Sequence, residues 1–155
     1  MAQAPDVRSK NDVMAFNSIT RLRLRSFFTL PAFLRDARAS AEQAGRSAGF
    51  ISSALLLEGR MVFWTRTAWE SEAAMKAYRD SDVHRAVMPK LVDWCDEASV
   101  AHWVGEPVSD WDEIYKQMTA AGRLSRVRHP TEAHTTKRFA PLKRWAPEQP
   151  IKPLT

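Results

Sequence analysis

FISSALLLEGRMVFWTRTAW, residues 50–69, carries the strongest fold signal in the chain. It contains two runs rich in aromatic and other apolar residues, 50–57 and 61–69, joined by Glu58, Gly59 and Arg60. A short connection that contains glycine is typical of a β-hairpin. The stretch therefore predicts two antiparallel strands.

The segments on either side of this hairpin complete a recognisable order of elements. Upstream, FNSITRLRLRS (16–26) predicts a strand, and a helix with Pro31 in its first turn follows it. Downstream, Ser71 and Ser81 begin two helical runs, the second (82–95) interrupted by Pro89, before a last strand at 98–104. The order β-α-β-β-α-β favours an α+β, ferredoxin-like fold with a four-stranded antiparallel sheet and helices on one side.

The predicted sheet is apolar on both faces, because the third strand carries large apolar residues at both parities: Met61, Phe63 and Trp69 against Val62, Trp64 and Ala68. A sheet that is apolar on both faces needs a second covering layer. A homodimer that packs sheet against sheet is favoured. The alternative is that the C-terminal segment folds over the sheet.

The chain divides into three parts. Residues 1–13 are polar and aperiodic, which predicts a disordered extension and makes Met14 an alternative start. Residues 14–106 form the ferredoxin-like domain. Residues 107–155 hold an amphipathic helix (110–121) and a proline-rich arm anchored at Phe139, Leu142 and Trp145, with eight Lys/Arg against two Asp/Glu over 123–155. Any attraction to anionic partners is thus expected from the arm.

Composition excludes several classes of protein. The single cysteine rules out an internal disulfide, and neither an export signal nor an apolar run long enough to span a bilayer is present, so a cytoplasmic protein is expected. Five glycines and no phosphate-binding loop argue against nucleotide or flavin cofactors. Cys95 fits a packed core thiol, and His129 and His134 fit a surface pair better than a metal site. We expect no metal, no cofactor and no nucleic-acid binding by the domain.

Two histidines are the candidate catalytic groups. His84 flanks the apolar stripe of the 82–95 helix on the same face as Met88, and His102 lies on the last strand. A neutral imidazole can act as a base on an acidic phenol. The alternative is a structural, hydrogen-bonded histidine at each place.

Aromatic and arginine residues on the strands are the candidate ligand-binding groups. Trp64, Trp69 and Tyr78 could wall a flat apolar ligand, or fill the core instead. Arg21, Arg23 and Arg25 alternate along a strand that should be central. Internal pairing with carboxylates is favoured, and contact between Arg23 and an anionic ligand is the alternative.

The string TRTAWESEAAMKAYRDSDVHRAVMPKLVDWCDEASVAHW (65–103) resembles the second half of an antibiotic-biosynthesis-monooxygenase-type domain, with Trp69, Ser81 and His84 at the family's tryptophan and Ser-x-x-His positions. ITRLRLRS (19–26) and RLSRVRHP (123–130) are similar to a bacterial group near the spheroidene monooxygenases. The resemblance implies a dimeric α/β barrel.

Members of that superfamily include oxygenases of polycyclic phenols without metal or flavin, haem degraders, and proteins of no known activity. The haem degraders use an Asn–Trp–His set. Asn17 matches the asparagine, but Tyr78 replaces the tryptophan and Met88 stands near the histidine position. Haem is therefore not supported as a cofactor.

The leading hypothesis is a cofactor-independent, monooxygenase-like protein acting on a small aromatic or polyene compound. His84 or His102 would deprotonate the substrate, Asn17 would hydrogen-bond the oxyanion, and the remaining candidates would bind it: Trp64, Trp69, Tyr78, Arg23 and Met88. A non-catalytic dimer that binds haem or an isoprenoid, and an interaction module that uses the basic arm, are the alternatives, so whether the protein is an enzyme stays open.

Overall fold

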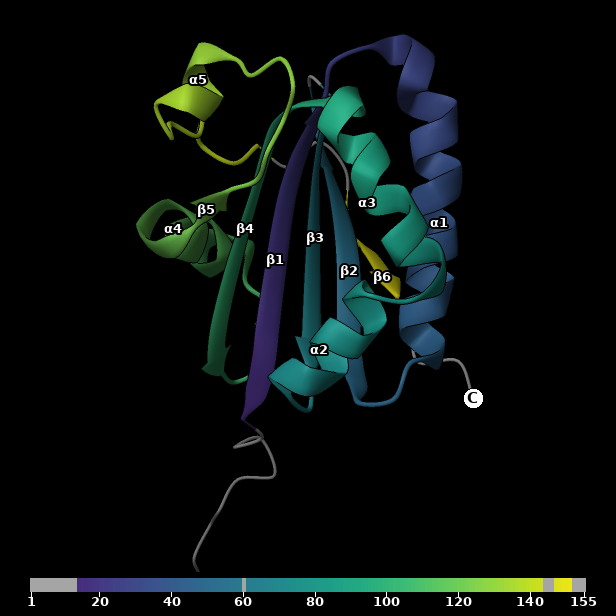
Figure 1. The fold of residues 1–155 in the computed structure, drawn as a ribbon. Helices are drawn as coiled ribbons and strands as arrows, with labels where there is room; N and C mark the ends of the chain where they lie inside the picture. The colour runs from purple at the N-terminus through teal and green to yellow at the C-terminus, as the bar shows by residue number, and fades with distance from the viewer. Residues whose placement is uncertain (1–13, 60, 144–146, 152–155) are drawn as a thin grey trace, which may run out of the picture.

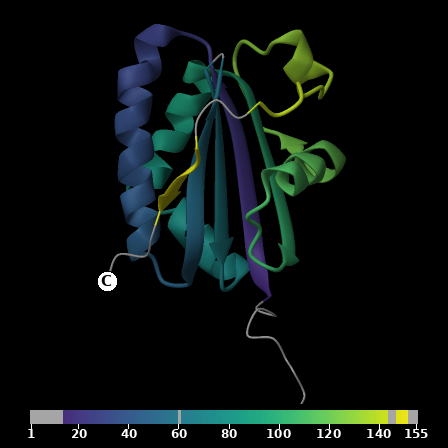
Figure 2. The ribbon, with the colours of Figure 1, turned by 180° about the vertical axis from the view of Figure 1, so that it is seen from behind.

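The computed structural model describes residues 14–59, 61–143 and 147–151. Its centre is a sheet with the strand order β5-β4-β1-β3-β2-β6, and helices lie on both faces (Figures 1 and 2). The strands are β1 (Ala15–Leu24), β2 (Phe50–Glu58), β3 (Val62–Trp69), β4 (Cys95–Gly105), β5 (Arg123–Leu124) and β6 (Gln149–Ile151). The helices are η1 (Phe27–Thr29), α1 (Leu30–Arg46), α2 (Glu72–Arg79), α3 (Asp82–Trp94), α4 (Trp111–Ala121) and α5 (Glu132–Thr135).

The four long strands confirm the predicted order and antiparallel pairing. Local signals act as expected: the Ser71 side chain accepts a hydrogen bond from the Ala74 amide, and Pro31 occupies the first turn of α1. The prediction of four strands is wrong, because the described sheet has six. The two additions, β5 and β6, are short edge strands from the C-terminal segment, whose sequence has no strand periodicity.

One face of the sheet, called here the helix side, is covered by α1, α2 and α3 (Figure 1). Its side chains form two separate apolar clusters. One contains Phe16, Trp69 and Met75, and the other contains Leu24, Phe33 and Cys95. Phe16 and Leu24 stand near opposite ends of β1, so the clusters close the two ends of this face.

The opposite face, called the α4 side, is closed by α4 and the chain that follows it (Figure 2). A single cluster joins residues of four strands to α4: Ile19, Ala54, Leu56, Val62, Trp64, Ala101, Trp111, Ile114 and Met118. Phe139 and Leu142 pack against it. The second apolar face is thus covered by the chain's own C-terminal segment, which is the alternative to a sheet-to-sheet dimer. The homodimer stays a prediction, but this face no longer supports it.

The C-terminal segment is folded onto the sheet, which corrects the expectation of an extended arm. Phe139 and Leu142 are the anchors that were predicted, whereas Trp145 and residues 1–13 lie outside the described residues. None of the helices in the described part of the chain is long and apolar enough to cross a bilayer.

The strand arginines pair internally, as favoured. Arg21 Nη1 lies 2.8 Å from Glu97 Oε2, and Arg23 Nη1 lies 2.9 Å from Asp96 Oδ2. Arg66 reaches Glu148 at 3.1 Å, which ties β3 to the C-terminal segment. Burial tends to raise the pKa of Glu97, but its hydrogen bonds from Arg21 and Thr131 outweigh this and hold the pKa below its usual value.

Candidate functional site

Strand register separates the candidate residues onto the two faces of the sheet. Side chains alternate along a strand, so odd-numbered residues of β1 and even-numbered residues of β3 share the α4 side. Asn17, Arg23 and Trp64 therefore lie on the α4 side. Trp69 and His102 lie on the helix side with α2 and α3, which carry the other three: Tyr78, His84 and Met88.

The α4-side candidates are already engaged with the protein. Asn17 is fully buried, donates to the Glu106 carbonyl at 3.0 Å and accepts from the Val108 amide at 3.1 Å. Trp64 is also fully buried, and its indole N–H donates to Glu58. Strand parity directs Asn17, Arg23 and Trp64 to the layer opposite His84, and of the two tryptophans Trp69 faces the helix side. The structure thus does not bring Asn17 together with His84, and the roles predicted for these residues stay predictions.

The helix side holds a continuous series of rings. Phe50 meets Trp69 edge-on at 5.5 Å, Trp69 stacks on Tyr78 at 5.0 Å and 26°, and Tyr78 meets His84 at 4.7 Å between ring centroids. The series joins β2, β3, α2 and α3. Trp69 is fully buried within it, so a ligand reaches that indole only by displacing a neighbouring ring. Met88 is 42% exposed on α3 and is not part of the series.

Gln43 of α1, which no sequence signal singled out, fixes the junction between α2 and α3. Its side-chain amide donates to the carbonyls of Tyr78 at 3.1 Å and Ser81 at 3.0 Å. Its side-chain oxygen accepts from the His84 amide at 2.9 Å. The Tyr78 hydroxyl donates to the Ser40 carbonyl at 3.0 Å, and burial raises the pKa of that hydroxyl. Tyr78 is therefore a fixed, neutral phenol.

His84 has a defined tautomer. Its Nδ1 lies 3.1 Å from the Arg79 carbonyl oxygen, which can only accept, so Nδ1 carries the proton and Nε2 keeps its lone pair. Burial lowers the pKa of His84 below its usual value, so the ring is neutral near pH 7.

His102 ends a row of polar side chains that crosses the helix side. The register aligns Ser53, Thr67, Ser18 and His102 on β2, β3, β1 and β4, and Thr65 pairs with Thr20 in the adjacent row. Ser18, Thr20, Thr65, Thr67 and His102 are only half-buried, because they lie between the two apolar clusters. In Figure 1, β1 and β4 stand in view beside α2 and α3. We call Ser53, Thr67, Ser18 and His102 the polar row.

Two features set the polar row apart from the surrounding sheet. Burial lowers the pKa of His102, and Arg123 and Arg79 lower it further, so this imidazole is also neutral near pH 7. The Ser53 hydroxyl is buried without a hydrogen-bond partner among the described residues, and so is the indole N–H of nearby Trp69. Buried polar groups of this kind are uncommon and mark places where water or a ligand completes the bonding. Sequence patterning missed the row because its residues come from four strands.

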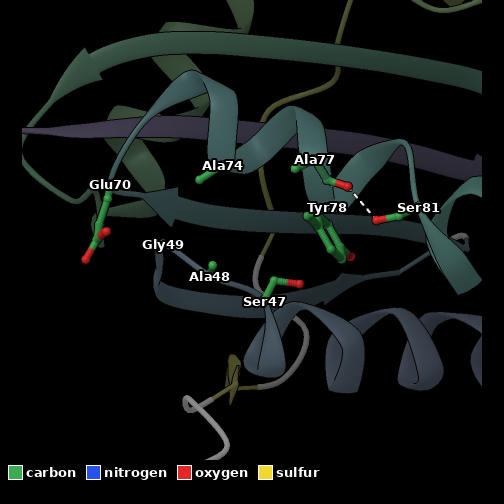
Figure 3. Close-up of a pocket in the computed structure, with 8 residues that line it drawn as sticks. All are labelled: Ser47, Ala48, Gly49, Glu70, Ala74, Ala77, Tyr78 and Ser81. Atoms are coloured by element: carbon green, nitrogen blue, oxygen red, sulfur yellow. Dashed lines mark hydrogen bonds between the residues drawn. The ribbon is translucent and has the colours of Figure 1, made fainter.

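A shallow groove of about 380 Å³ opens beside Tyr78, between the loop that follows α1 and the start of α2 (Figure 3). Tyr78 points across it toward Ser47, and Ala74 and Ala77 form part of its wall. The loop lies close to α2 because Gly49 has a φ of 81°, and a Cβ added there would stand 2.6 Å from the Ala74 Cβ. Tyr78 is the member of the ring series that lines this groove.

The remaining residues that the sequence singled out are Cys95, His129 and His134. Cys95 is buried in the core, and burial raises the pKa of its thiol to about 12. His134 is buried and accepts a hydrogen bond from the Ala98 amide, whereas His129 is exposed. Among the described residues, histidine, cysteine and carboxylate side chains form no group of three that could hold a metal ion.

The family comparison bears on the part of the chain that contains α1, the hairpin, α2 and most of α3. Residues 29–90 match the family model described as antibiotic biosynthesis monooxygenase. The match is to the antibiotic biosynthesis monooxygenase family. Among curated protein sequences, none matches the chain.

Solved structures support the same fold. A conserved protein of Methanosarcina mazei Go1 superposes with a TM-score of 0.54 at 15% identity, covering 59% of this chain and 92% of that one. Rv0793 of Mycobacterium tuberculosis superposes with a TM-score of 0.52 at 16% identity, and the match covers 62% of this chain and 97% of that one. PA3566 of Pseudomonas aeruginosa superposes with a TM-score of 0.52 at 12% identity, and the match covers 62% of this chain and 96% of that one. The match spans almost the whole of each of these proteins. Over a third of this chain has no counterpart in them, which is comparable to the length of its C-terminal extension.

Proposed function

We propose that the protein is a cofactor-independent monooxygenase-like enzyme that acts on a small, acidic aromatic compound bound on the helix side. The observation that carries the proposal is the polar row, in which Ser18, Thr67 and His102 are half-buried and the histidine at the end is neutral. Such a row offers hydroxyl groups to a phenolic oxygen and a base to an adjacent acidic proton. The match to the antibiotic biosynthesis monooxygenase family supports the reaction class.

The chemistry needs a proton acceptor and little else from the protein. His102 would take a proton from the substrate, and the Ser18 hydroxyl would donate a hydrogen bond to the resulting anion. The Thr67 hydroxyl donates to the Ser18 carbonyl at 3.3 Å, so it would line the site without holding the anion. The electron-rich anion would then react with dioxygen. For an acidic CH₂ group on an aromatic ring system, CH₂ and O₂ give C=O and H₂O, so the substrate supplies all the electrons. A polyene without an acidic proton fits this mechanism less well than a phenol.

His84 is the second candidate base from the sequence. Its Nε2 lone pair is free for proton transfer, but its contacts to Tyr78 and Arg79 also fix the α2–α3 junction. We assign it a positioning role and assign proton abstraction to His102.

Turnover of acidic polycyclic phenols with and without oxygen tests the proposal, together with two matched variants. His102→Gln should abolish oxygen consumption and product formation, whereas His84→Gln should keep measurable turnover. Oxygen-independent conversion across the phenols would sink the oxygenase proposal. If only His84→Gln loses activity, proton abstraction would be assigned to His84 and not to His102.

The second candidate function is a non-catalytic binder of a small hydrophobic ligand such as haem or an isoprenoid. The open shape of the groove beside Tyr78 favours it, because a dry oxygenase pocket is usually more enclosed. It predicts saturable binding without oxygen uptake. Haem binding would appear as a Soret band that shifts when His84 or His102 is replaced.

A further inference from the structure

Two adjacent phenylalanines are largely exposed to solvent at the end of the molecule where β1 leads into α1. Phe27 is 76% exposed and Phe28 is 96% exposed. The Ser26 side chain accepts a hydrogen bond from the Phe28 amide, which fixes the turn that holds the two rings. Leu34, in α1, is also exposed, at 49%. Exposed large apolar residues that cluster in this way mark an interaction surface.

The same end of the molecule is strongly basic. The Arg25 amide donates to the Trp94 carbonyl and the Arg128 amide donates to the Val92 carbonyl, so both segments meet at the end of α3. Figures 1 and 2 agree that the β1–α1 connection and α5 lie at one end of the sheet. Residues 25–38 and 126–138 together carry seven Lys/Arg and two Asp/Glu, and two of the arginines pair with acids outside these ranges, Arg128 with Asp93 and Arg38 with Glu42. One of these acids, Asp36, is buried and bonded to Lys90.

We propose that this end, comprising Phe27, Phe28 and the arginines around them, docks on an anionic lipid surface. Aromatic side chains partition into the interfacial region of a bilayer, and neighbouring cations are attracted to anionic headgroups. A hollow of about 190 Å³ lined by Arg25 and Phe27 offers a place for a headgroup phosphate. The proposal stands independently of the catalytic proposal.

The charge of the patch argues against the main alternative, a second copy of the chain. Pairing two copies through Phe27 and Phe28 would bring the Arg25 and Arg35 side chains of both copies together, and like charges repel in such a contact. The phenylalanines also protrude, which suits insertion between lipids. Two side chains and a basic rim provide weak, reversible binding.

Co-sedimentation of the full chain with phosphatidylcholine vesicles, with and without phosphatidylglycerol, tests the proposal. Binding is expected only when phosphatidylglycerol is present and should weaken with salt. Phe28→Ser should reduce the apparent affinity about tenfold, which is the contribution of burying one such side chain. Val104→Ser, which alters a 63% exposed apolar residue on β4, is the matched control and should leave binding unchanged.

Three outcomes would overturn the proposal. The first is absence of binding to either vesicle. The second is equal loss in Phe28→Ser and Val104→Ser. The third is self-association of the wild-type chain in sedimentation velocity that Phe28→Ser abolishes, because it would assign the patch to a second copy. Weaker vesicle binding by the charge-reversal variant Arg25→Glu, with an unchanged circular dichroism spectrum, would support the proposal.

Discussion

The two faces of one sheet differ in how completely they are packed. On the α4 side, a single cluster runs from Ile19 and Trp64 to Ile114 and Met118, all fully buried. On the helix side, two clusters close the ends and leave half-buried hydroxyl residues between them. Complete packing gives stability and leaves no room for a ligand. We therefore expect substitutions on the α4 side to affect mainly stability and substitutions on the helix side to affect mainly ligand binding.

Breaking the buried ion pair of the α4 side should have the largest effect. Glu97→Ala leaves Arg21 charged and buried, and removal of one partner from such a pair costs about 3–5 kcal/mol. Urea unfolding measures this as a lower free energy of unfolding. Glu132→Ala, an exposed acid in α5, is the control and should change little. A wild-type-like midpoint for Glu97→Ala would mean that the pair contributes nothing.

A cavity in the α4-side cluster should come next. Ile114→Ala removes buried methyl groups where α4 meets the sheet, with an expected loss of about 2–4 kcal/mol. Urea unfolding measures this loss as a lower free energy of unfolding, and an unchanged circular dichroism spectrum shows that the fold is kept. If Ile114→Ala keeps the fold but also loses turnover, the two faces do not act separately, and the proposed division between them is wrong.

Gln43→Ala tests the helix side and should cost less stability, about 1–3 kcal/mol, because it removes hydrogen bonds at a half-buried junction. Its effect on ligand binding near Tyr78 should exceed its effect on unfolding. Gln117→Ala in α4, whose side chain bonds only to Glu113 among the described residues, is the matched control. Equal effects of the two variants on binding would remove Gln43 from the site.

The smallest expected effect is a pH dependence from the helix side. The pKa values of His84 and His102 are lowered by burial, so both rings are neutral in the folded protein. Their contribution is present above the usual value of 6.5 and is lost as the pH falls through the folded values. Stability should therefore decline below about pH 6.5, and the double variant His84→Gln, His102→Gln should flatten that decline.

Most of the fold followed from local patterns. The hairpin at 50–69, the capping serine Ser71 and the helix near 110–121 were predicted and are present. The two edge strands β5 and β6 were not, because a short strand is stabilised by its neighbour and leaves no periodicity in its own sequence.

The sequence named candidate residues but could not say which of them lie on the same face of the sheet. His84, His102, Trp69 and Tyr78 do share the helix side, whereas parity removed Asn17, Trp64 and Arg23. The polar row escaped detection since Ser53, Thr67, Ser18 and His102 are distant in sequence and become neighbours only through strand pairing.

By itself, the sequence determined the order of strands and helices and the need for a layer on each face of the sheet, because alternation and helical spacing depend only on near neighbours. Only the tertiary structure decided which layer covers the second face. It also decided which carboxylate meets each arginine and which hydroxyls meet His102. These choices depend on contacts between residues far apart in the chain, such as Ile19 with Ile114 and Arg66 with Glu148, and no local pattern encodes them.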